Sequence, residues 1–380
     1  MKLILASLLV GLIFIIQYQV FKRIWSKKLD VAISFDKDIL YEQEENVLRE
    51  VITNGKRFPL PILQIKFSIT RTFLFENEEN SAVTDQYYRS EYFTVMPMQK
   101  ITRSYPFRCT QRGLYRMNTM DVICTSIFLD GKLIESREHE ARVCVLPLKI
   151  PHKRVPTAVT SLIGDIEKNV HINDDPFSFA GIRAYQPFDN IRSINWKVTA
   201  RTGELQVNTY NTTFSKEIVL LLNMETNSMV KIHEIREWTI RIANHLGAYF
   251  IKKHIPVALY TNGVDCVDKT EIEIKAGADM SHIRTIEVAL ARLEVQDRPA
   301  VFSKMIKEKV KAASNNVEYI IISNNRKEDV IKAYEEAMAN YNVHFVIPEF
   351  DYNELEDEFT EPKYTKWLIT NEDEKICNMR

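Results

Sequence analysis

The chain has 380 residues, a length that suits two or three domains rather than one. Its 50 Lys and Arg residues are balanced by 51 Asp and Glu residues, so the net charge of −1 offers no basic excess for binding nucleic acid. With 45% hydrophobic residues, 10 Gly and 13 Pro, the composition excludes a disordered chain. The five cysteines form no C-x-x-C pair, which predicts reduced, buried thiols.

The amino-terminal residues predict a membrane anchor. Residues 3–20 carry no charged side chain, and this length fits one bilayer-crossing helix of about 20 residues. The sequence QYQVFKRIW at residues 17–25 lacks the small residues of a signal-peptide cleavage site. Lys22, Arg23, Lys27 and Lys28 come next, and positive charge stays on the cytoplasmic side. We therefore predict that residues 1–28 are a transmembrane helix with a basic flank, in a single-pass protein of the cell membrane whose body is cytoplasmic.

Residues 29–150 have the alternating pattern of half-buried strands. In residues 30–35 every second side chain is apolar, and residues 61–70 repeat the pattern as PILQIKFSIT. Asn54-Gly55 and the two prolines of RFPLP, at 59 and 61, are turn signals between such runs. Short strands without a convincing amphipathic helix predict a β-sandwich, and a barrel of similar size fits the same pattern.

After residue 215 the pattern changes to alternating strands and helices. The run EIVLLLNM at 217–224 is uninterrupted and apolar, as in a strand buried on both faces. Further strands are expected at 256–261, 317–323 and 342–348, and helices at 233–255, 280–294, 302–313 and 328–340. Residues 215–350 should therefore form an α/β domain with a mostly parallel sheet. Residues 151–214 would be a linker and signature segment, and residues 351–380 an acidic tail. The fold class predicted for the whole chain is α+β multidomain.

The segment GIRAYQPFDNIRSINWKVTARTGELQV, residues 181–207, resembles the signature of the domain-of-unknown-function 58 family. The candidates for a docking or clamping site in this segment are Arg183, Tyr185, Asp189, Arg192, Asn195, Trp196 and Arg201, and all of them except Asn195 match the signature. QRGLY at 111–115 is similar to a turn of the same family, whereas Phe188 replaces its usual Gly. The resemblance implies a von Willebrand factor A-like domain behind a β-sandwich and a MoxR-type AAA+ ATPase as partner. It implies no enzymatic activity.

Two interpretations of this segment are open. Asp189 would cap a helix that runs to about Ala200, with Ile191, Ile194 and Val198 on the core face and Arg192 and Trp196 on another. In the structural interpretation Arg183, Arg192 and Arg201 pair with Asp174, Asp175 or Glu204, and Trp196 is mostly buried. In the other interpretation Trp196 and Arg192 belong to a docking face for a partner. The segment has no His, Cys or paired carboxylates, so we predict no catalytic residue.

Many von Willebrand A domains bind Mg²⁺ through a D-x-S-x-S loop, and the corresponding loop here is degenerate. It reads NMETNSM, which puts Met224 or Asn223 where the Asp would stand, while Thr226 and Ser228 keep the hydroxyls and Glu225 could turn inward. We expect no cofactor and no metal at this loop. Mg²⁺ bound by Asn223, Glu225, Thr226 and Ser228 is the alternative.

Together these features predict a membrane-anchored, non-enzymatic interaction protein. It would be a partner or adaptor of a MoxR-type AAA+ ATPase in the assembly or maturation of membrane or envelope components. The alternative is a metal-dependent hydrolase that uses the degenerate loop.

Overall fold

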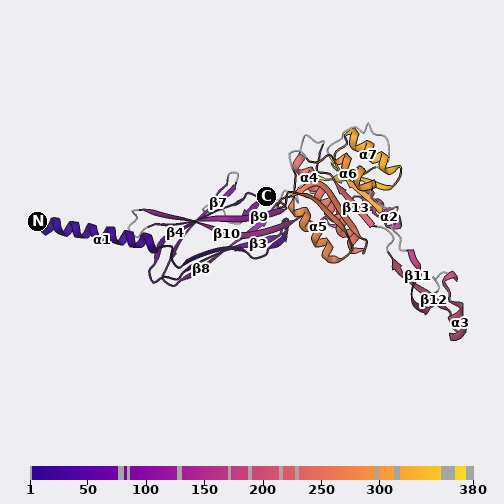
Figure 1. Cartoon of the computed structure of the whole chain (residues 1–380), viewed down its shortest axis with the longest axis horizontal. Coiled ribbons are helices and arrows are strands. Elements are labelled where there is room, and N and C mark those ends of the chain that lie inside the picture. The colour runs from indigo at the N-terminus through magenta and orange to yellow at the C-terminus, as the bar shows by residue number, and fades with distance from the viewer. Residues whose placement is uncertain are drawn as a thin grey trace. The chain divides into compact units, whose positions relative to one another are not determined.

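A computed structural model describes the chain at residues 2–75, 81–83, 86–125, 131–169, 173–186, 191–213, 217–226, 231–295, 299–311, 317–351 and 364–373. The chain divides into two compact units (Figure 1). The first comprises Met1–Lys149, Leu290–Arg292 and Asn371–Arg380, and the second comprises Ile150–Ala289 and Leu293–Thr370.

The first unit begins with helix α1 (Lys2–Ile24). Within the described ranges no helix is both long enough and apolar enough to span a bilayer, so the predicted transmembrane helix and single-pass anchor at residues 1–28 are wrong. The uncharged run at residues 3–20 includes the polar side chains of Gln17, Tyr18 and Gln19 near its end. Phe21 in the last turn of α1 and Trp25 directly after the helix are buried in the hydrophobic core of the first unit.

The rest of the first unit is a sandwich of two sheets. The four-stranded sheet has the order β1 (Leu29–Phe35), β3 (Glu45–Asn54), β8 (Lys100–Cys109), β5 (Phe73–Phe75). The six-stranded sheet has the order β2 (Ile39–Tyr41), β10 (Lys132–Leu146), β9 (Gly113–Thr125), β4 (Leu60–Thr70), β7 (Gln86–Val95), β6 (Ser81–Val83). All pairings are antiparallel except that of β2 with β10. The predicted β-sandwich is confirmed.

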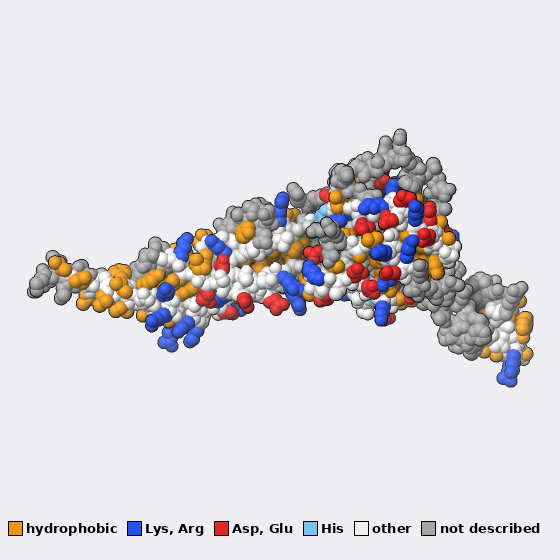
Figure 2. Space-filling model, turned by 45° about the horizontal axis from the view of Figure 1, so that its top comes forward, with side chains coloured by type: hydrophobic (Ala, Val, Ile, Leu, Met, Phe, Trp, Pro, Cys, Tyr) orange, Lys and Arg blue, Asp and Glu red, His pale blue; other side chains and the backbone are white. Residues whose placement is uncertain are grey.

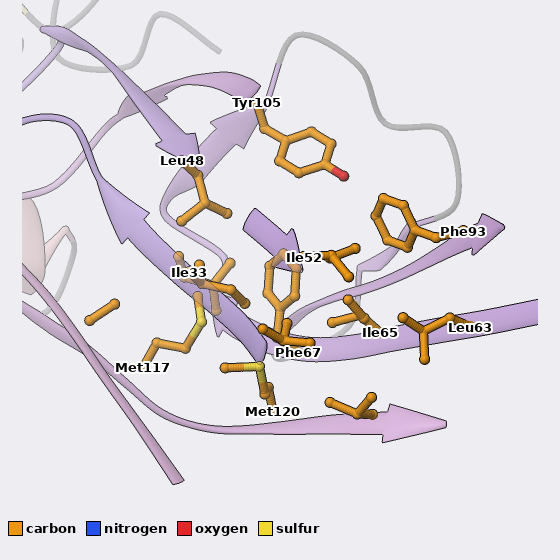
Figure 3. Packing of buried hydrophobic residues seen from close by; sticks show 14 of the residues in the cluster. Ile33, Leu48, Ile52, Leu63, Ile65, Phe67, Phe93, Tyr105, Met117 and Met120 are labelled. Atoms are coloured by element: carbon orange, nitrogen blue, oxygen red, sulfur yellow. The ribbon is translucent and has the colours of Figure 1, made fainter. Parts of the chain in front are cut away.

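Alternating side chains of both sheets form the core of this sandwich. Along β3 the inward residues include Leu48 and Ile52, which are completely buried, and along β4 they include Leu63 and Ile65. Figure 3 shows these side chains pointing toward one another from different strands. Because side chains alternate across a strand, the period of two seen in the sequence is the direct cause of this packing.

The described cysteines are free thiols. Cys109, Cys124 and Cys144 are buried in the first unit, whereas Cys266 in the second unit is partly exposed. Burial raises the pKa of the Cys109 thiol to about 12 and that of Cys124 to about 11. A thiol held in its neutral form is a weak nucleophile, so the two act as small core residues.

The second unit is built on a seven-stranded sheet. Its main order is β15 (Glu271–Gly277), β14 (Val257–Asp265), β13 (Glu217–Leu222), β17 (Val317–Ile322), β18 (Asn342–Phe350), β19 (Tyr364–Ile369), and β16 (Leu293–Glu294) also pairs with β14. β19 lies in the predicted acidic tail, where no strand was expected. The other elements of this unit are η1 (His152–Arg154), α2 (Thr157–Asn169), β11 (Asn173–Ala184), η2 (Ile191–Ser193), α3 (Trp196–Thr202), β12 (Gln206–Thr213), α4 (Ile232–Lys252), α5 (Met280–Arg292), α6 (Phe302–Lys311) and α7 (Glu328–Met338).

The sheet is mixed, so the prediction of a mostly parallel sheet of von Willebrand A type is wrong. β14, β13, β17, β18 and β19 pair in parallel, but β15 and β16 both pair antiparallel with β14. The cause is a tight turn after β14, in which the Asp265 carboxylate accepts from the Val267 amide at 2.7 Å and the Asp265 amide donates to Thr270 O at 2.8 Å. Such a short connection joins antiparallel strands, since a parallel pair needs a crossover of a dozen residues or so.

Helices cover both faces of the central strands (Figure 1). Val219 and Leu221 of β13 pack in one cluster with residues of α6 and α7. Leu220 faces the other way, and a Cβ placed on Gly247 of α4 would lie 3.6 Å from its side chain. This double coverage explains why β13 is a continuous apolar run.

Candidate functional site

The signature segment forms its own two-stranded sheet. β11 and β12 pair antiparallel, with Arg183 opposite Val207 and Ala184 opposite Gln206. Tyr185 N donates to Leu205 O at 2.9 Å, which extends the pairing by one step. η2 and α3 lie between the two strands in the chain.

The helix predicted from Asp189 to about Ala200 is wrong at its start. Asn195 N donates to Gln206 O at 2.8 Å, and Ile194 forms a β-bridge with Val207, so the backbone is held in an extended pairing there. α3 therefore begins at Trp196, with Asn195 as its cap: Oδ1 accepts from Val198 N at 3.1 Å. Gly203 ends the helix in the left-handed region, as its φ of 79° shows.

Asn195 is the residue that joins α3 to the strands. While Oδ1 caps the helix, Nδ2 donates to Asn208 Oδ1 on β12 at 2.7 Å. The side chain is therefore structural. Asp189, the predicted cap, lies outside the described residues, and so does the side chain of Arg192. Since α3 excludes Arg192, the helical face that it was predicted to share with Trp196 does not exist.

The apolar side chains of this segment are exposed rather than packed. Trp196 is 64% exposed, which disagrees with the structural interpretation, and Ile191 is 67% exposed although it was predicted on the core face, whereas Ile194 is buried as predicted. Leu205 is also exposed. We call the exposed side chains of Ile191, Trp196, Lys197, Arg201 and Leu205 the signature surface. Figure 2 shows hydrophobic and basic side chains together on this part of the chain, at the right of the view.

The predicted arginine clamp stays a prediction. Arg183 is exposed and its Nη1 donates to Ala184 O at 3.2 Å. The side chains of Asp174 and Asp175, its expected partners, lie outside the described residues. Arg201 and Glu204 are both exposed. Tyr185 is half-buried.

The degenerate metal loop lies at the carboxyl ends of β13, β14 and β17, where buried amides bind one another. Asn223 Oδ1 accepts from Asn262 Nδ2 at 3.0 Å and from the Glu225 amide at 2.9 Å. Asn223 Nδ2 donates to Ser323 Oγ at 2.9 Å. Asn262 also reaches back to the loop, because its Oδ1 accepts from the Met224 amide at 2.8 Å.

The more exposed residues of this loop are also engaged. Thr226 Oγ1 donates to Asn324 Oδ1 at 3.1 Å, and Glu225 Oε2 accepts from Asn325 Nδ2 at 3.2 Å. Met224, in a position where a von Willebrand A domain would place a carboxylate, is completely buried, and Ser228 lies outside the described residues. Across the described ranges no three His, Cys, Asp or Glu side chains gather as metal ligands. A hard cation needs several oxygens free to coordinate it, and this donor set of paired amides does not fit one.

Replacing Asn223 by alanine should lower the free energy of unfolding by about 1–3 kcal/mol, because Ser323 and Asn262 would lose a buried partner. Denaturant unfolding of the full chain measures this. Asn340→Ala is the control, since the Asn340 amide donates to Glu336 O on an exposed helix end. Equal losses in the two variants would contradict the role of the network.

The chain is similar to one protein family and to parts of several solved structures. No curated protein matches the chain. Among solved structures, the CARDB domain of a Pyrococcus furiosus protein in complex with di-metal ions matches at 13% identity and a TM-score of 0.21, covering 31% of this chain and 94% of that chain. A non-cellulosomal cohesin from Archaeoglobus fulgidus matches at 11% identity and a TM-score of 0.22, covering 31% and 91%. A PapD-like domain of human CEP192 matches at 11% identity and a TM-score of 0.22, covering 32% and 87%.

A family profile described as "Protein of unknown function DUF58" matches residues 181–290. This range begins at the first residue of the signature and continues through most of α5. The chain thus resembles the DUF58 family from the signature segment through most of α5, as the residues from Gly181 to Val207 predicted.

Proposed function

We propose that the protein is a non-enzymatic interaction protein that binds its partner through the signature surface. The observation that carries the proposal is Trp196, which is 64% exposed on a short helix although tryptophan is usually packed. Ile191 and Leu205 add exposed apolar area on the same segment. Trp and Arg are enriched among the residues that dominate binding energy at interfaces, and both are present here.

The surface carries more positive than negative charge. Lys197 and Arg201 are exposed on α3, which has no acidic residue in its first turn, and Glu204 follows the helix. A partner that presents carboxylates around an apolar pocket would complement it. The resemblance to the family leads us to propose a MoxR-type AAA+ ATPase as this partner. Among the described residues, three oxygens that the alternative hydrolase would need are engaged with amides: Asn223 Oδ1, Glu225 Oε2 and Thr226 Oγ1.

Replacing Trp196 by alanine should separate stability from binding. The free energy of unfolding should change by less than about 1 kcal/mol, as for ordinary surface substitutions. The dissociation constant for the ATPase should rise by at least ~30-fold, which corresponds to the loss of a hot spot worth about 2 kcal/mol. Isothermal titration calorimetry with the purified MoxR-type ATPase encoded nearest to this protein would measure it.

Met280→Ala is the matched control, because Met280 is an apolar residue of the same unit that is 62% exposed. Met280→Ala should leave the free energy of unfolding and the dissociation constant for the ATPase unchanged. A Trp196→Ala variant that binds the ATPase as tightly as the parent, or one that unfolds the protein, would overturn the proposed docking role.

A further inference from the structure

The interior of the sandwich contains charged side chains that packing alone does not explain. Glu50 on β3 is 1% exposed, and Arg89 and Glu91 on β7 are buried as well. β3 belongs to the four-stranded sheet and β7 to the six-stranded sheet, and all three side chains point inward. Charged residues are almost never fully buried unless they are paired.

Glu91 is fully paired. Arg89 Nε donates to its Oε1 at 2.8 Å, and Arg103 Nη1 on β8 donates to its Oε2 at 2.9 Å. The Arg89 guanidinium also lies over the Tyr105 ring, 3.9 Å from its centroid. Since Arg89 comes from one sheet and Tyr105 and Arg103 from the other, these contacts hold the two sheets together at β7 and β8.

Only one of the two carboxyl oxygens of Glu50 has a hydrogen-bond partner. The Tyr105 hydroxyl donates to Glu50 Oε2 at 3.0 Å, but Glu50 Oε1 is buried and has no hydrogen-bond partner. Burying an ionised carboxylate that has one oxygen without a hydrogen bond costs much free energy, because the charge loses its hydration. Burying a carboxyl group that keeps its proton costs much less. The negative charge of Glu91 nearby adds to this cost.

We propose that Glu50 is a proton-controlled contact inside the sandwich: while it is neutral the sheets stay closed over the Arg89–Glu91–Arg103 cluster, and its ionisation favours their opening at β7 and β8. Burial is the main reason for the direction of this control. Burial and, to a smaller extent, the charge of Glu91 raise the pKa of Glu50, the Tyr105 hydrogen bond and the two arginines lower it, and the net result is a rise from 4.5 to about 7.

The sign follows from the raised pKa. Between the unfolded and the folded pKa the open state binds fewer protons than the closed state, so stability is highest below about pH 4.5 and is lost as the pH rises through 7. The difference between the pKa of Glu50 in the open state and in the closed state corresponds to a roughly 50-fold fall in the closed-to-open ratio between pH 5 and pH 8.

Other titratable groups near Glu50 can be separated from it. Burial and the neighbouring carboxyls raise the pKa of the Tyr105 hydroxyl, so it stays neutral in this range. Arg89 and Arg103 keep their charge. On the β1 side Ile33 is the register partner of Glu50, and His139 Nε2 contacts the backbone of Ile33. His139 therefore needs its own control.

Hydrogen exchange of the full chain, followed by mass spectrometry at several values between pH 5 and pH 8, tests the proposal. After correction for the intrinsic pH dependence of exchange, peptides from β3, β7 and β8 should lose roughly 50-fold in protection in the parent protein. Glu50→Gln should remove most of this dependence, because the amide has the same shape but no proton to lose. His139→Gln should keep it.

Tyr105→Phe gives a second, independent readout. It removes a hydrogen bond that favours the ionised carboxyl, so the midpoint of the protection profile should move to higher pH. If Glu50→Gln shows the same pH profile as the parent, the proposal is overturned. If Glu50→Gln does not fold, an unchanged or lowered midpoint in Tyr105→Phe overturns it, and a raised midpoint supports it.

Discussion

Replacing Trp25 by alanine is expected to lower the free energy of unfolding of the sandwich by about 3–5 kcal/mol, the usual loss when a packed aromatic side chain is removed. Trp25 follows α1 directly and is buried in the same core cluster as the strands. Its carbonyl oxygen also accepts a hydrogen bond from Lys56 Nζ, a buried ammonium group. The end of α1 is thus part of the sandwich core rather than a tether.

Denaturant unfolding, followed by the protection of β3 and β8 peptides so that the two units are not averaged, measures this loss. Val20→Ala is the matched control: Val20 is half exposed on α1 and should change stability by less than about 0.5 kcal/mol. A Trp25→Ala loss no larger than that of Val20→Ala would show that α1 does not support the sandwich. Truncation at residue 28 should fail for the same reason, whereas truncation before Phe21 should be tolerated.

Replacing Glu91 by alanine should cost a similar amount, about 3–5 kcal/mol. The substitution leaves the buried Arg89 guanidinium without its carboxylate, and an uncompensated buried charge is strongly destabilising. Arg103 would lose the same partner but is itself 43% exposed and can turn to solvent. The loss is measured by denaturant unfolding with the same β3 and β8 peptides.

The control is an ion pair of equal length at the surface. Arg49 and Asp36 are 2.8 Å apart, as close as Arg89 and Glu91, but both side chains are exposed. Asp36→Ala should therefore cost less than about 1 kcal/mol, since solvent screens exposed pairs. If the two substitutions cost the same, burial does not govern the energetics of the cluster.

The strands of the sandwich could be predicted because their signal is local. Side chains at every second position of β1 and β4 face one core, and this period is visible in the sequence itself. The central strand β13 was equally visible, since two covered faces require an apolar side chain at nearly every position. Pairing direction is not local. It depended on the Asp265 turn, which folds β15 back along β14, and no strand had been predicted at residues 271–277.

The prediction of a helix from Asp189 to about Ala200 was wrong for a related reason. Residues 189–200 have acceptable helical spacing, but Ile194 and Asn195 take backbone partners on β12, thirteen and eleven residues later in the chain. These distant partners override local propensity and shift the start of the helix to Trp196. The same shift brings Trp196 to the first position of a helix of seven residues, where it is exposed. The exposure of this tryptophan could not be predicted from residue types, because it depends on which parts of the folded chain pack against the side chain.

The three buried cysteines of the first unit can report how often this unit opens, through the rate at which their thiols are labelled. An alkylating reagent reacts with the thiolate, and Cys109 and Cys124 are both shielded and held neutral while the sandwich is closed. Cys266, in the second unit, is partly exposed. Labelling at Cys266 would therefore be rapid and report on the second unit, whereas slow labelling at Cys109 and Cys124 would count the openings of the first. One chain, without any engineered probe, can thus be followed unit by unit.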